Sequence, residues 1–576
     1  MEFSSINTLW VIFGASLVFI MQAGFAMLET GFTRSKNAGN IIMKNLLDLS
    51  IGLLVYWIIG YGIMYGSGGS FAGVIDFFSK GSYDTGSIPK WCHLIYSAMF
   101  CATAATIVSG SMAERTKFGA YLIYSAVASS VVFPVVGHWV WGNGWLSAIS
   151  IDGVTGFKDY AGSSIVHLVG GTAALIGASF IGPRIGKYGK DGKARAIPGH
   201  SVTLGALGIF LLWFGWLGFN ICSGKAIDTD EAIATAGSVL INTCISAACA
   251  LIAAMSFLWV RYRKPDVSMT LNGALGGLVA ITGASAYVSV ECAAIIGIIS
   301  GIITVCSIEF VDNVLKIDDP VGAIGVHGMN GLWGTIAVGL FSETTGSLFT
   351  EGTAQLKIQL LGAVCIIGWT CLILIPTFFI LKKTIGIRVS REDEVAGLDI
   401  SEHALESSYA DFVIVDDQTL VEFPENVESL PEEAIPLEMN INSEDTEIYM
   451  VTIICKQEKF DALKNALDDI GVTGITVTQA LGCGTQKGFR HYYRGVKLEA
   501  RLLPRVKVEI AISKIPVSAV INAARKALYT GHIGDGKIFV SPIYNVVRVR
   551  TGVSGYDALQ DDRTALEKET KSETTT

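Results

Sequence analysis

The chain has 576 residues, of which 51% are hydrophobic and only 16% are charged, and its mean hydropathy is +0.50. This composition excludes a wholly soluble protein and predicts a membrane protein. The formal net charge is −9 and no basic patch with interleaved aromatic residues is present, so nothing indicates nucleic-acid binding. The eleven cysteines include no C-x-x-C pair, which argues against a zinc site or a disulfide framework.

Apolar segments of about 20 residues follow one another from the start of the chain to about Lys382. The first basic residue is Arg34, after the first segment, so we expect that segment to be retained rather than cleaved as a signal peptide. About eleven spans are predicted, an odd number that places the two ends of the helical part on opposite sides of the membrane. The predicted spans are residues 8–29, 40–66, 91–113, 118–141, 161–183, 200–222, 234–260, 269–288, 291–311, 321–342 and 356–381.

The basic residues of the short loops predict the orientation of the chain. One set of alternate loops carries Arg34, Lys36, Arg115, Lys117, Arg184, Lys187, Lys190, Lys193, Arg195, Arg261, Arg263, Lys264 and Lys316. The other set carries only Lys80, Lys90, Lys158, Lys225 and Lys357. Because basic loops stay in the cytoplasm, we expect a multi-pass protein of the plasma membrane with its N-terminus outside and everything after Lys382 inside.

The composition changes after the last span. No Lys or Arg occurs between Glu392 and Cys455, and we interpret residues 410–446 as an acidic linker that is either a tether or a plain solvated spacer. From residue 447, β-rich runs at 448–455, 474–481, 505–513, 537–543 and 545–551 alternate with helical stretches around 456–470 and 516–530. This order predicts a soluble α+β domain of ferredoxin-like type over 447–556, followed by a disordered tail at 557–576.

A histidine motif occurs twice in the helical part. The first copy, DYAGSSIVHLVGG, places His167 eight residues after Asp159, and the same spacing separates His327 from Asp319. Gly162, Val166 and Gly171 of the first copy also recur, 160 residues later. The copies fall on the fifth and tenth predicted spans, which run in opposite directions, so we expect an inverted 5+5 repeat with the pathway at the interface of its halves.

Eight residues of α-helix rise about 12 Å, which places each imidazole near the middle of a ~30 Å hydrocarbon core. Each histidine alone is equally well interpreted as a core residue that a neighbouring polar group satisfies, but a symmetric pair favours a function. The acids have a structural alternative as helix N-caps. A metal site would need further ligands that Glu29, Asp48 and Glu291 have no evident reason to supply.

Paired imidazoles between apolar walls suit a substrate that sheds its charge, because a neutral molecule crosses cheaply while the histidines carry the proton. Ammonium is a small cation of this kind. The segments MQAGFAMLETGFTRSKNAGNIIMKNLLD, GSMAERTKF, WLGFN, DDPVGAIGVHG and GIRVSREDEVAGLDISEHA resemble the Amt/Mep/Rh ammonium transporter family over about residues 1–405. The resemblance implies a membrane domain at 1–385, a cytoplasmic C-terminal segment at 386–409 and a homotrimer.

The resemblance also implies site residues. Trp141, Ser223 and Phe100 match the outer vestibule that binds ammonium, with Tyr96 where many members have phenylalanine. Phe100 and Phe219 match the gate, and Asp159, His167 and His327 match the conduction path. Without the family, the aromatic residues are better interpreted as interface-belt residues, in the case of Trp141 and Trp145, or as ordinary packing residues, in the case of Phe100 and Phe219.

The C-terminal domain carries loops that suit an anion. Glycines at Thr530–Lys537 and Gly482–Gly488 let backbone N–H groups approach phosphate oxygens, although a tight turn alone would also explain them. Residues 447–556 resemble the P-II nitrogen-signalling proteins, which are trimers that bind ATP or ADP and 2-oxoglutarate. The resemblance implies nucleotide contacts from Thr476, Gly484, Gly534, Asp535, Gly536, Lys537, Arg548 and Arg550. It assigns Gln486 and Arg505 to magnesium and 2-oxoglutarate, and Arg494 to a loop that blocks the transporter pore.

We therefore expect an ammonium transporter, inserted in membrane lipid, that its own P-II domain regulates in cis in response to adenine nucleotide and 2-oxoglutarate. The alternative is an ammonium sensor that signals through the P-II domain with little flux. An enzyme is not expected, because no nucleophile–base constellation or hydrolytic motif is present. Deletion of the chain after about Ser407 separates regulation from a pure output role.

Overall fold

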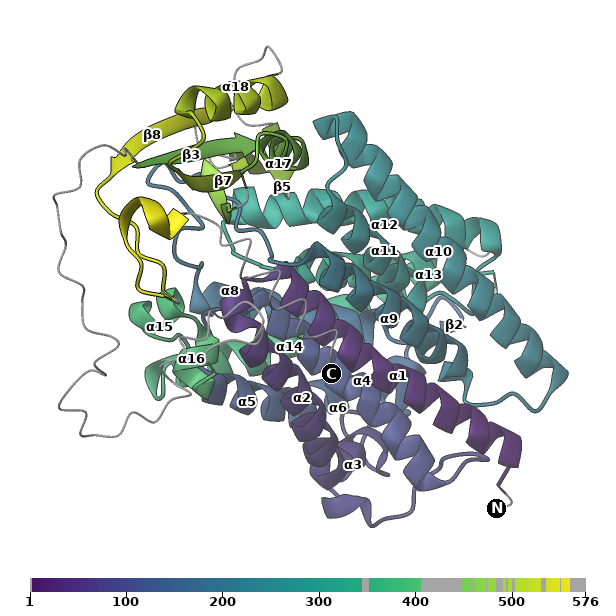
Figure 1. Cartoon of the computed structure of the whole chain (residues 1–576). Helices are drawn as coiled ribbons and strands as arrows, with labels where there is room; N and C mark the ends of the chain where they lie inside the picture. The colour runs from purple at the N-terminus through teal and green to yellow at the C-terminus, as the bar shows by residue number, and fades with distance from the viewer. Residues whose placement is uncertain are drawn as a thin grey trace, which may run out of the picture. The chain divides into compact units, whose positions relative to one another are not determined.

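In the computed structural model, the described residues are 3–343, 352–405, 448–456, 459–472, 474–482, 490–493, 496–499, 503–529, 535–549 and 551–559. The chain forms two compact units, an N-terminal helical unit and a C-terminal α+β unit (Figure 1). The predicted linker at 410–446 and tail at 557–576 lie outside the described residues, apart from the last turn at 557–559.

Within the described part of the helical unit, nine helices are long and apolar enough to cross a membrane. Each of the eleven predicted spans overlaps a helical segment. The eighth corresponds to the shorter α11, and the tenth to a π-helical turn that continues as a short α-helix. The α-helices are α1 Ser5–Phe32, α2 Ala38–Val55, α3 Tyr61–Tyr65, α4 Lys90–Ser111, α5 Phe118–Val127, α6 Phe133–Trp141, α7 Trp145–Ala148, α8 Val169–Ile181, α9 Val202–Ile221, α10 Asp230–Tyr262, α11 Val267–Thr282, α12 Val290–Phe310, α13 Asn330–Phe341, α14 Ala354–Lys383, α15 Arg391–Ala396 and α16 Leu398–His403.

Five of the long helices begin at a side chain that caps the first turn. Ser4, Ser201, Thr229, Asp266 and Ser289 each accept a hydrogen bond from the backbone N–H three residues later. Such a cap contributes about 1 kcal/mol by satisfying an N–H that the helix cannot pair. Polar residues at the ends of apolar runs therefore set the first residue of these helices.

π-Helical turns interrupt or begin several spans. They are η2 Tyr56–Gly60, η4 Ala128–Val132, η5 Ser163–Leu168, η7 Val311–Leu315 and η8 Ile324–Met329. Two of the five, η5 and η8, hold the repeated histidines. π-Helical turns are often found at functional sites, because the extra residue re-aims the side chains that follow.

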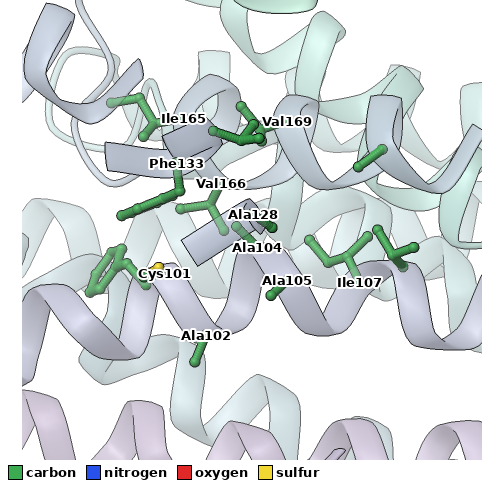
Figure 2. Packing of buried hydrophobic residues seen from close by; sticks show 14 of the residues in the cluster. Cys101, Ala102, Ala104, Ala105, Ile107, Ala128, Phe133, Ile165, Val166 and Val169 are labelled. Atoms are coloured by element: carbon green, nitrogen blue, oxygen red, sulfur yellow. The ribbon is translucent and has the colours of Figure 1, made fainter. Parts of the chain in front are cut away.

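Small residues let the helices approach closely. A Cβ added to Gly31 would lie 2.3 Å from the backbone nitrogen of Gly205, so α1 and α9 meet backbone to backbone. Figure 2 shows α4 against the segment that carries Val166 and Val169, with alanines of α4 between the two elements. Close approach of this kind is how membrane helices gain packing energy, since lipid gives no hydrophobic drive to associate.

The α+β unit contains a four-stranded antiparallel sheet. Strands β3 Ile448–Lys456, β4 Thr476–Gly482, β7 Leu503–Ile512 and β8 Lys537–Ile543 lie in the order β4-β7-β3-β8. The helices α17 Phe460–Asp468 and α18 Val517–Leu528 follow the first and third of these strands in the chain. This is the predicted ferredoxin-like arrangement, with its core between one face of the sheet and the two helices.

One predicted strand of this unit is wrong. The described residues of 545–551 form no strand and make only an isolated bridge between Val547 and Ser554. The chain turns back there, because Arg548 accepts backbone hydrogen bonds from Thr551 and Gly552. A β-branched run without a neighbouring strand to pair with gains no ladder, so its propensity alone does not make it a strand. Short strands β5 Arg490–Tyr493 and β6 Val496–Glu499 pair with each other.

Candidate functional site

A cavity of about 290 Å³ opens among the residues predicted to form the outer vestibule. Trp141, Phe100, Tyr96 and Ser223 all line it. Ser223 lies at the end of α9, in the turn η6 Cys222–Gly224, and donates its hydroxyl to the carbonyl of Phe219 at 2.7 Å. The four residues predicted to bind the substrate are therefore brought together from α4, α6 and η6.

The Tyr96 hydroxyl has its own structural use. It lies 3.1 Å from the carbonyl oxygen of Gly218, 3.2 Å from that of Phe219 and 3.4 Å from the Ser223 hydroxyl. These partners lie in the last turn of α9 and in the turn η6 that follows it. The phenol therefore ties α4 to α9 beside the cavity, while its ring packs edge-on against Phe100 at 4.9 Å.

Two phenylalanines close the floor of this cavity. The rings of Phe100 and Phe219 stack with their centroids 4.0 Å apart and their planes 25° apart. Trp141 stands edge-on to Phe100 at 5.9 Å, and its indole N–H donates to the carbonyl oxygen of Asp159 at 2.8 Å. Both phenylalanines are almost fully buried, so the stacked pair separates the cavity from the residues beneath it.

The two predicted histidines meet beyond the phenylalanine pair. Their Nδ1 atoms lie 3.1 Å apart, and the rings are nearly parallel, with centroids 5.2 Å apart. Phe219 lies 5.7 Å from the ring of His167, which joins the gate to the histidines. The indole of Trp216 stacks on His167 at 5.0 Å and also lies 5.7 Å from the ring of Phe219. The Nε2 atom of His167 is buried and has no hydrogen-bond partner.

One Nδ1 of this pair must carry a hydrogen and the other must accept it, since two donors or two acceptors would repel at 3.1 Å. The pair therefore has a direction, which reverses when the donor ring gains a proton at Nε2, the shared proton crosses, and the other ring loses a proton from its Nε2. With one imidazole nitrogen left unpartnered in an apolar surrounding, the site offers a hydrogen bond to a small neutral molecule.

The repeated aspartates cap the segments that carry the histidines. Asp159 accepts hydrogen bonds from the backbone N–H groups of Gly162, Ser164 and Ile165 at 2.8–3.0 Å. Asp319 accepts from Gly322 and Ile324 at 3.0 and 2.7 Å. Gly162 and Gly322 have φ of 114° and 84°, which favours glycine and explains why both copies keep it.

The last glycine of each copy presses on the residue that follows the other copy's histidine. A Cβ on Gly171 would lie 2.1 Å from the nitrogen of Gly328, and a Cβ on Gly331 would lie 2.7 Å from that of Leu168. The repeat therefore crosses over itself at backbone distance, beside the histidine pair. The shared glycines set this distance.

A second, smaller cavity of about 20 Å³ lies on the other side of His327. Apolar residues of α1, α4 and α11 line it together with Glu29. Glu29 accepts hydrogen bonds from Asn45 at 3.1 Å and Ser109 at 2.8 Å. Sequence reasoning found no cause for Glu29 to approach the histidines. Within the described chain, no group of three or more His, Cys, Asp or Glu side chains could hold a metal ion.

Buried ion pairs join the loops at the end of the bundle that holds Arg115. Arg184 pairs with Glu114 at 2.6 Å and with Asp318 at 2.8 Å, and Arg34 also pairs with Glu114. Burial raises the pKa of the Glu114 carboxyl, but the guanidinium groups of Arg184 and Arg34 lower it more, so it stays below its usual range. These loops belong to the set that charge counting placed in the cytoplasm.

The predicted C-terminal segment of the helical unit lies against these loops. Asp399 of α16 accepts from the backbone N–H groups of Gly39 and Asn40 at 3.0 and 2.8 Å, which caps the start of α2. Glu394 of α15 pairs with Arg388 at 2.7 Å and accepts from the N–H of Ile185 at 2.6 Å. Residues 386–405 therefore contact the loops after α1, α4 and α8.

Several predicted ligands of the C-terminal domain lie at one end of strand β3. Asp535 pairs with Lys456 at 3.7 Å, and Gly536 has φ of 127°, where an added Cβ would lie 2.1 Å from the carbonyl oxygen of Ile454. Lys537 begins β8, and Arg505 lies opposite Lys456 on β7. A left-handed glycine between an acid and a lysine fits a backbone that approaches a phosphate.

The other predicted ligands of this domain lie farther from that end of β3 or fall outside the described residues. Thr476 begins β4, opposite Glu509 on β7 and four residues along that strand from Arg505. Arg548 donates to the carbonyl oxygens of Ala558 and Asp557 at 3.2 and 3.4 Å. Gly484, Gln486, Arg494, Gly534 and Arg550 lie outside the described residues.

Sequence reasoning missed three residues of the membrane site. They are Trp216, which stacks on His167, Glu29 beside His327, and Lys225, which lines the outer cavity. Ionisable residues in or near apolar spans were the available signal for Glu29 and Lys225. No pattern in the sequence distinguishes Trp216 from an ordinary packing residue.

Comparison with known proteins identifies the family of each part of the chain. Residues 9–409 match the Ammonium Transporter Family and residues 448–553 match Nitrogen regulatory protein P-II. The ammonium transporter Amt2 of Archaeoglobus fulgidus is 43% identical over 71% of this chain and 89% of its own. The putative ammonium transporter sll1017 of Synechocystis sp. is 42% identical over 69% of this chain and 88% of its own.

Solved structures resemble the helical unit. A protein described as "Sensor Amt Protein" is 38% identical, with a TM-score of 0.64, over 69% of this chain and 98% of its own. Candida albicans Mep2 is 26% identical, with a TM-score of 0.61, over 68% of this chain and 88% of its own. The chain therefore belongs to the ammonium transporter family and carries a P-II domain after its membrane helices.

Proposed function

We propose that the protein transports ammonium along the column from Trp141 to His327 and that its P-II domain regulates this transport in cis. The observation that carries the proposal is the continuous sequence of contacts from the outer cavity, through the stacked phenylalanines, to the histidine pair. Each part of the column suits a different state of the substrate. The cation is bound first, and the neutral molecule crosses.

Ammonium binds outside, where the faces of aromatic rings attract a cation and the Ser223 hydroxyl accepts a hydrogen bond. At the rings of Phe100 and Phe219 it gives a proton to the unpartnered Nε2 of His167, because a bare cation beyond these apolar rings has no compensating partner. The ammonia then hydrogen bonds to the imidazoles, and the proton travels separately through the histidine pair. Ammonium re-forms when both reach water on the far side.

We further propose a homotrimer in the plasma membrane, with the N-terminus outside and the P-II domain in the cytoplasm. The charge of the loops supports this orientation. The P-II domain would bind ATP or ADP at Asp535, Gly536 and Lys537, and magnesium with 2-oxoglutarate near Arg505. Arg494 would enter the cytoplasmic end of the pore. The covalent link raises the local concentration of that loop at the pore.

The transport proposal is tested by ammonium-jump currents on purified protein in liposomes. A saturable current is expected from the unmodified chain. The double variant His167→Ala, His327→Ala removes both proton carriers, so we expect the current to fall to the level of empty liposomes. An unchanged current in the double variant would contradict the proposed path.

Regulation in cis is tested with the same currents. ATP, ADP and 2-oxoglutarate are expected to change the current of the full chain, and a chain that ends after about Ser407 is expected to ignore them. Lys537→Met is a finer variant, since it removes one charge from the proposed phosphate site. Equal modulation of the full and shortened chains would contradict regulation by the P-II domain.

A sensor is the second candidate, because the "Sensor Amt Protein" resembles this chain at 38% identity. In that case the membrane part binds ammonium and signals through the P-II domain with little flux. The sensor proposal predicts ammonium binding without a sustained current, and no change in flux on truncation. A sustained, saturable current would favour the transporter instead.

A further inference from the structure

We propose that Lys225 is a tethered cation that competes with ammonium for the outer vestibule and thereby sets the affinity and pH dependence of substrate binding. The inference rests on the proposed function, since it concerns the site where the substrate first binds. It concerns a residue that neither the histidine motif nor the predicted vestibule includes. Its ammonium group has the same charge as the substrate and the same kind of N–H hydrogen-bond donor.

The position of Lys225 carries the proposal. It lines the same cavity of about 290 Å³ as Trp141, Phe100 and Ser223. It follows the turn η6 and caps it in a left-handed conformation, with φ of 57°. A left-handed backbone is uncommon for a residue other than glycine. Here it ends the turn η6 and is found together with a Lys225 side chain that lines the cavity.

The contacts of its ammonium group are those of a bound cation. The Nζ atom lies 2.8 Å from Nε2 of His93 and 5.4 Å from the centre of the Tyr65 ring. His93 Nδ1 lies 3.1 Å from the Tyr61 hydroxyl, and the Tyr65 ring lies edge-on to the His93 ring at 4.6 Å. An aromatic face and a hydrogen-bond acceptor are also what the vestibule offers ammonium.

The charge of Lys225 is poorly compensated. The titratable side chains that face it or line the cavity with it are His93 of α4, Tyr65 of α3, Tyr96 of α4 and Tyr160 of the loop before η5. Tyr61 and Tyr83 lie behind His93 and Tyr65. None of these groups is an anion at neutral pH, and Asp228, three residues away, is bonded to Asn7 at 2.6 Å.

Burial lowers the pKa of the Lys225 ammonium to about 8. The group is therefore charged below that pH and increasingly neutral above it. While it is charged, it repels a second cation in the same small cavity and occupies part of the aromatic surface. As it loses its proton, this competition ends and the vestibule binds ammonium more tightly.

The test compares three forms of the full chain: the unmodified protein, Lys225→Gln and Lys225→Arg. Glutamine keeps a donor for His93 without the charge, and arginine keeps the charge at every accessible pH. Ammonium-jump currents give the KM of each form below and above pH about 8. Lys80→Gln is the matched control, because Lys80 lies in the same predicted set of outer loops but is exposed and does not line the cavity.

Below that pH, Lys225→Gln is expected to lower KM roughly tenfold, the size of one like-charge contact in a partly solvated site. The KM of the unmodified protein is expected to fall toward that of the glutamine variant as the pH rises through about 8. Lys225→Arg should keep the high KM throughout. Because the ammonium to ammonia ratio changes equally for all forms, the comparison between variants isolates Lys225.

If the unmodified protein, Lys225→Gln and Lys80→Gln have the same KM at every pH, the inference is overturned, although transport itself is then established. If the unmodified protein carries no current, the proposed transport fails, and the inference is then decided by calorimetric ammonium binding to the same variants. Tighter binding by Lys225→Gln below the same pH supports it, and equal binding overturns it.

Discussion

The two copies of the histidine motif have the same inner construction and different surroundings. Both begin at an aspartate that caps a π-helical turn, both place a left-handed glycine three residues later, and both end at a glycine in backbone contact with the other copy. Around Asp159 lie aromatic rings and an open cavity. Around Asp319 lie Asp318, Arg115 and Arg184, which form buried ion pairs and hydrogen bonds.

This difference between the two ends separates the features that the repeated motif determines from those that residues outside the motif determine. The motif itself fixes the meeting of the imidazoles, since that geometry depends on short-range caps within each copy and on glycine contacts between the copies. The ends are specialised by residues outside the motif. The end at Asp159 is suited to bind a cation, and the end at Asp319 holds loops together. An inverted repeat is therefore compatible with a pathway whose two ends differ.

The largest expected effect lies at the ion-paired end. Asp318 accepts three hydrogen bonds from Arg184 and is fully buried. Asp318→Ala removes one of the two carboxylates that compensate this buried guanidinium and leaves it with Glu114 alone, which costs about 3–5 kcal/mol of unfolding free energy. Thermal denaturation in detergent is expected to show a large drop. The exposed pair Lys357–Asp152 is the control, because Asp152→Ala should cost about 0–1 kcal/mol.

The same variant makes a pH-dependent prediction. Burial raises the pKa of Asp318, but Arg184 and Arg115 lower it more, so the folded-state pKa lies far below its usual range. A depressed pKa contributes stability that is complete above the unfolded value of about 4 and is lost as the pH falls below it. The Tm gap between the unmodified protein and Asp318→Ala should stay constant from pH about 5 to about 8 and narrow below about 4.

The next effect lies where the two copies touch. Gly171→Ala places a Cβ 2.1 Å from the backbone of Gly328, so the elements must separate, at a cost of about 1–3 kcal/mol. The reciprocal change Gly328→Ala meets the nearest atom at 3.5 Å and should be nearly neutral. Currents and Tm are expected to fall for the first variant only. Equal loss in both would mean that the contact is not what holds the copies.

The smallest effect compares the two caps. Asp159→Asn and Asp319→Asn each keep one acceptor oxygen, so each is expected to cost about 1 kcal/mol in stability. The ammonium current of Asp159→Asn should be lower than that of Asp319→Asn if the charge of Asp159 also attracts ammonium to the adjacent cavity. If both variants lose the same fraction of current, the two acids act as caps alone and the contrast between the ends is weaker.

The membrane spans and the histidine pair could be predicted from the sequence because their signals are local. The length of the apolar segments predicts the membrane spans, and the repeated spacing of Asp, Gly and His predicts the histidine pair. The predicted strand at 545–551 failed because a strand depends on a neighbour that local composition does not reveal. Lys225 and Glu29 were visible as ionisable residues, but nothing in the sequence told which cavity each would line.

The stacking around His167 has a kinetic consequence. Trp216 stacks on the His167 ring at 5.0 Å, and His327 meets the edge of that ring, with the two Nδ1 atoms 3.1 Å apart, while the Trp216 indole N–H is fixed by a hydrogen bond to Thr282. A half-turn of the imidazole would require these neighbours to spread. Nδ1 of His167 therefore keeps facing His327. After each turnover the pair recovers its starting tautomer by proton movement and not by ring rotation. The rate of this recovery therefore depends on the supply of protons.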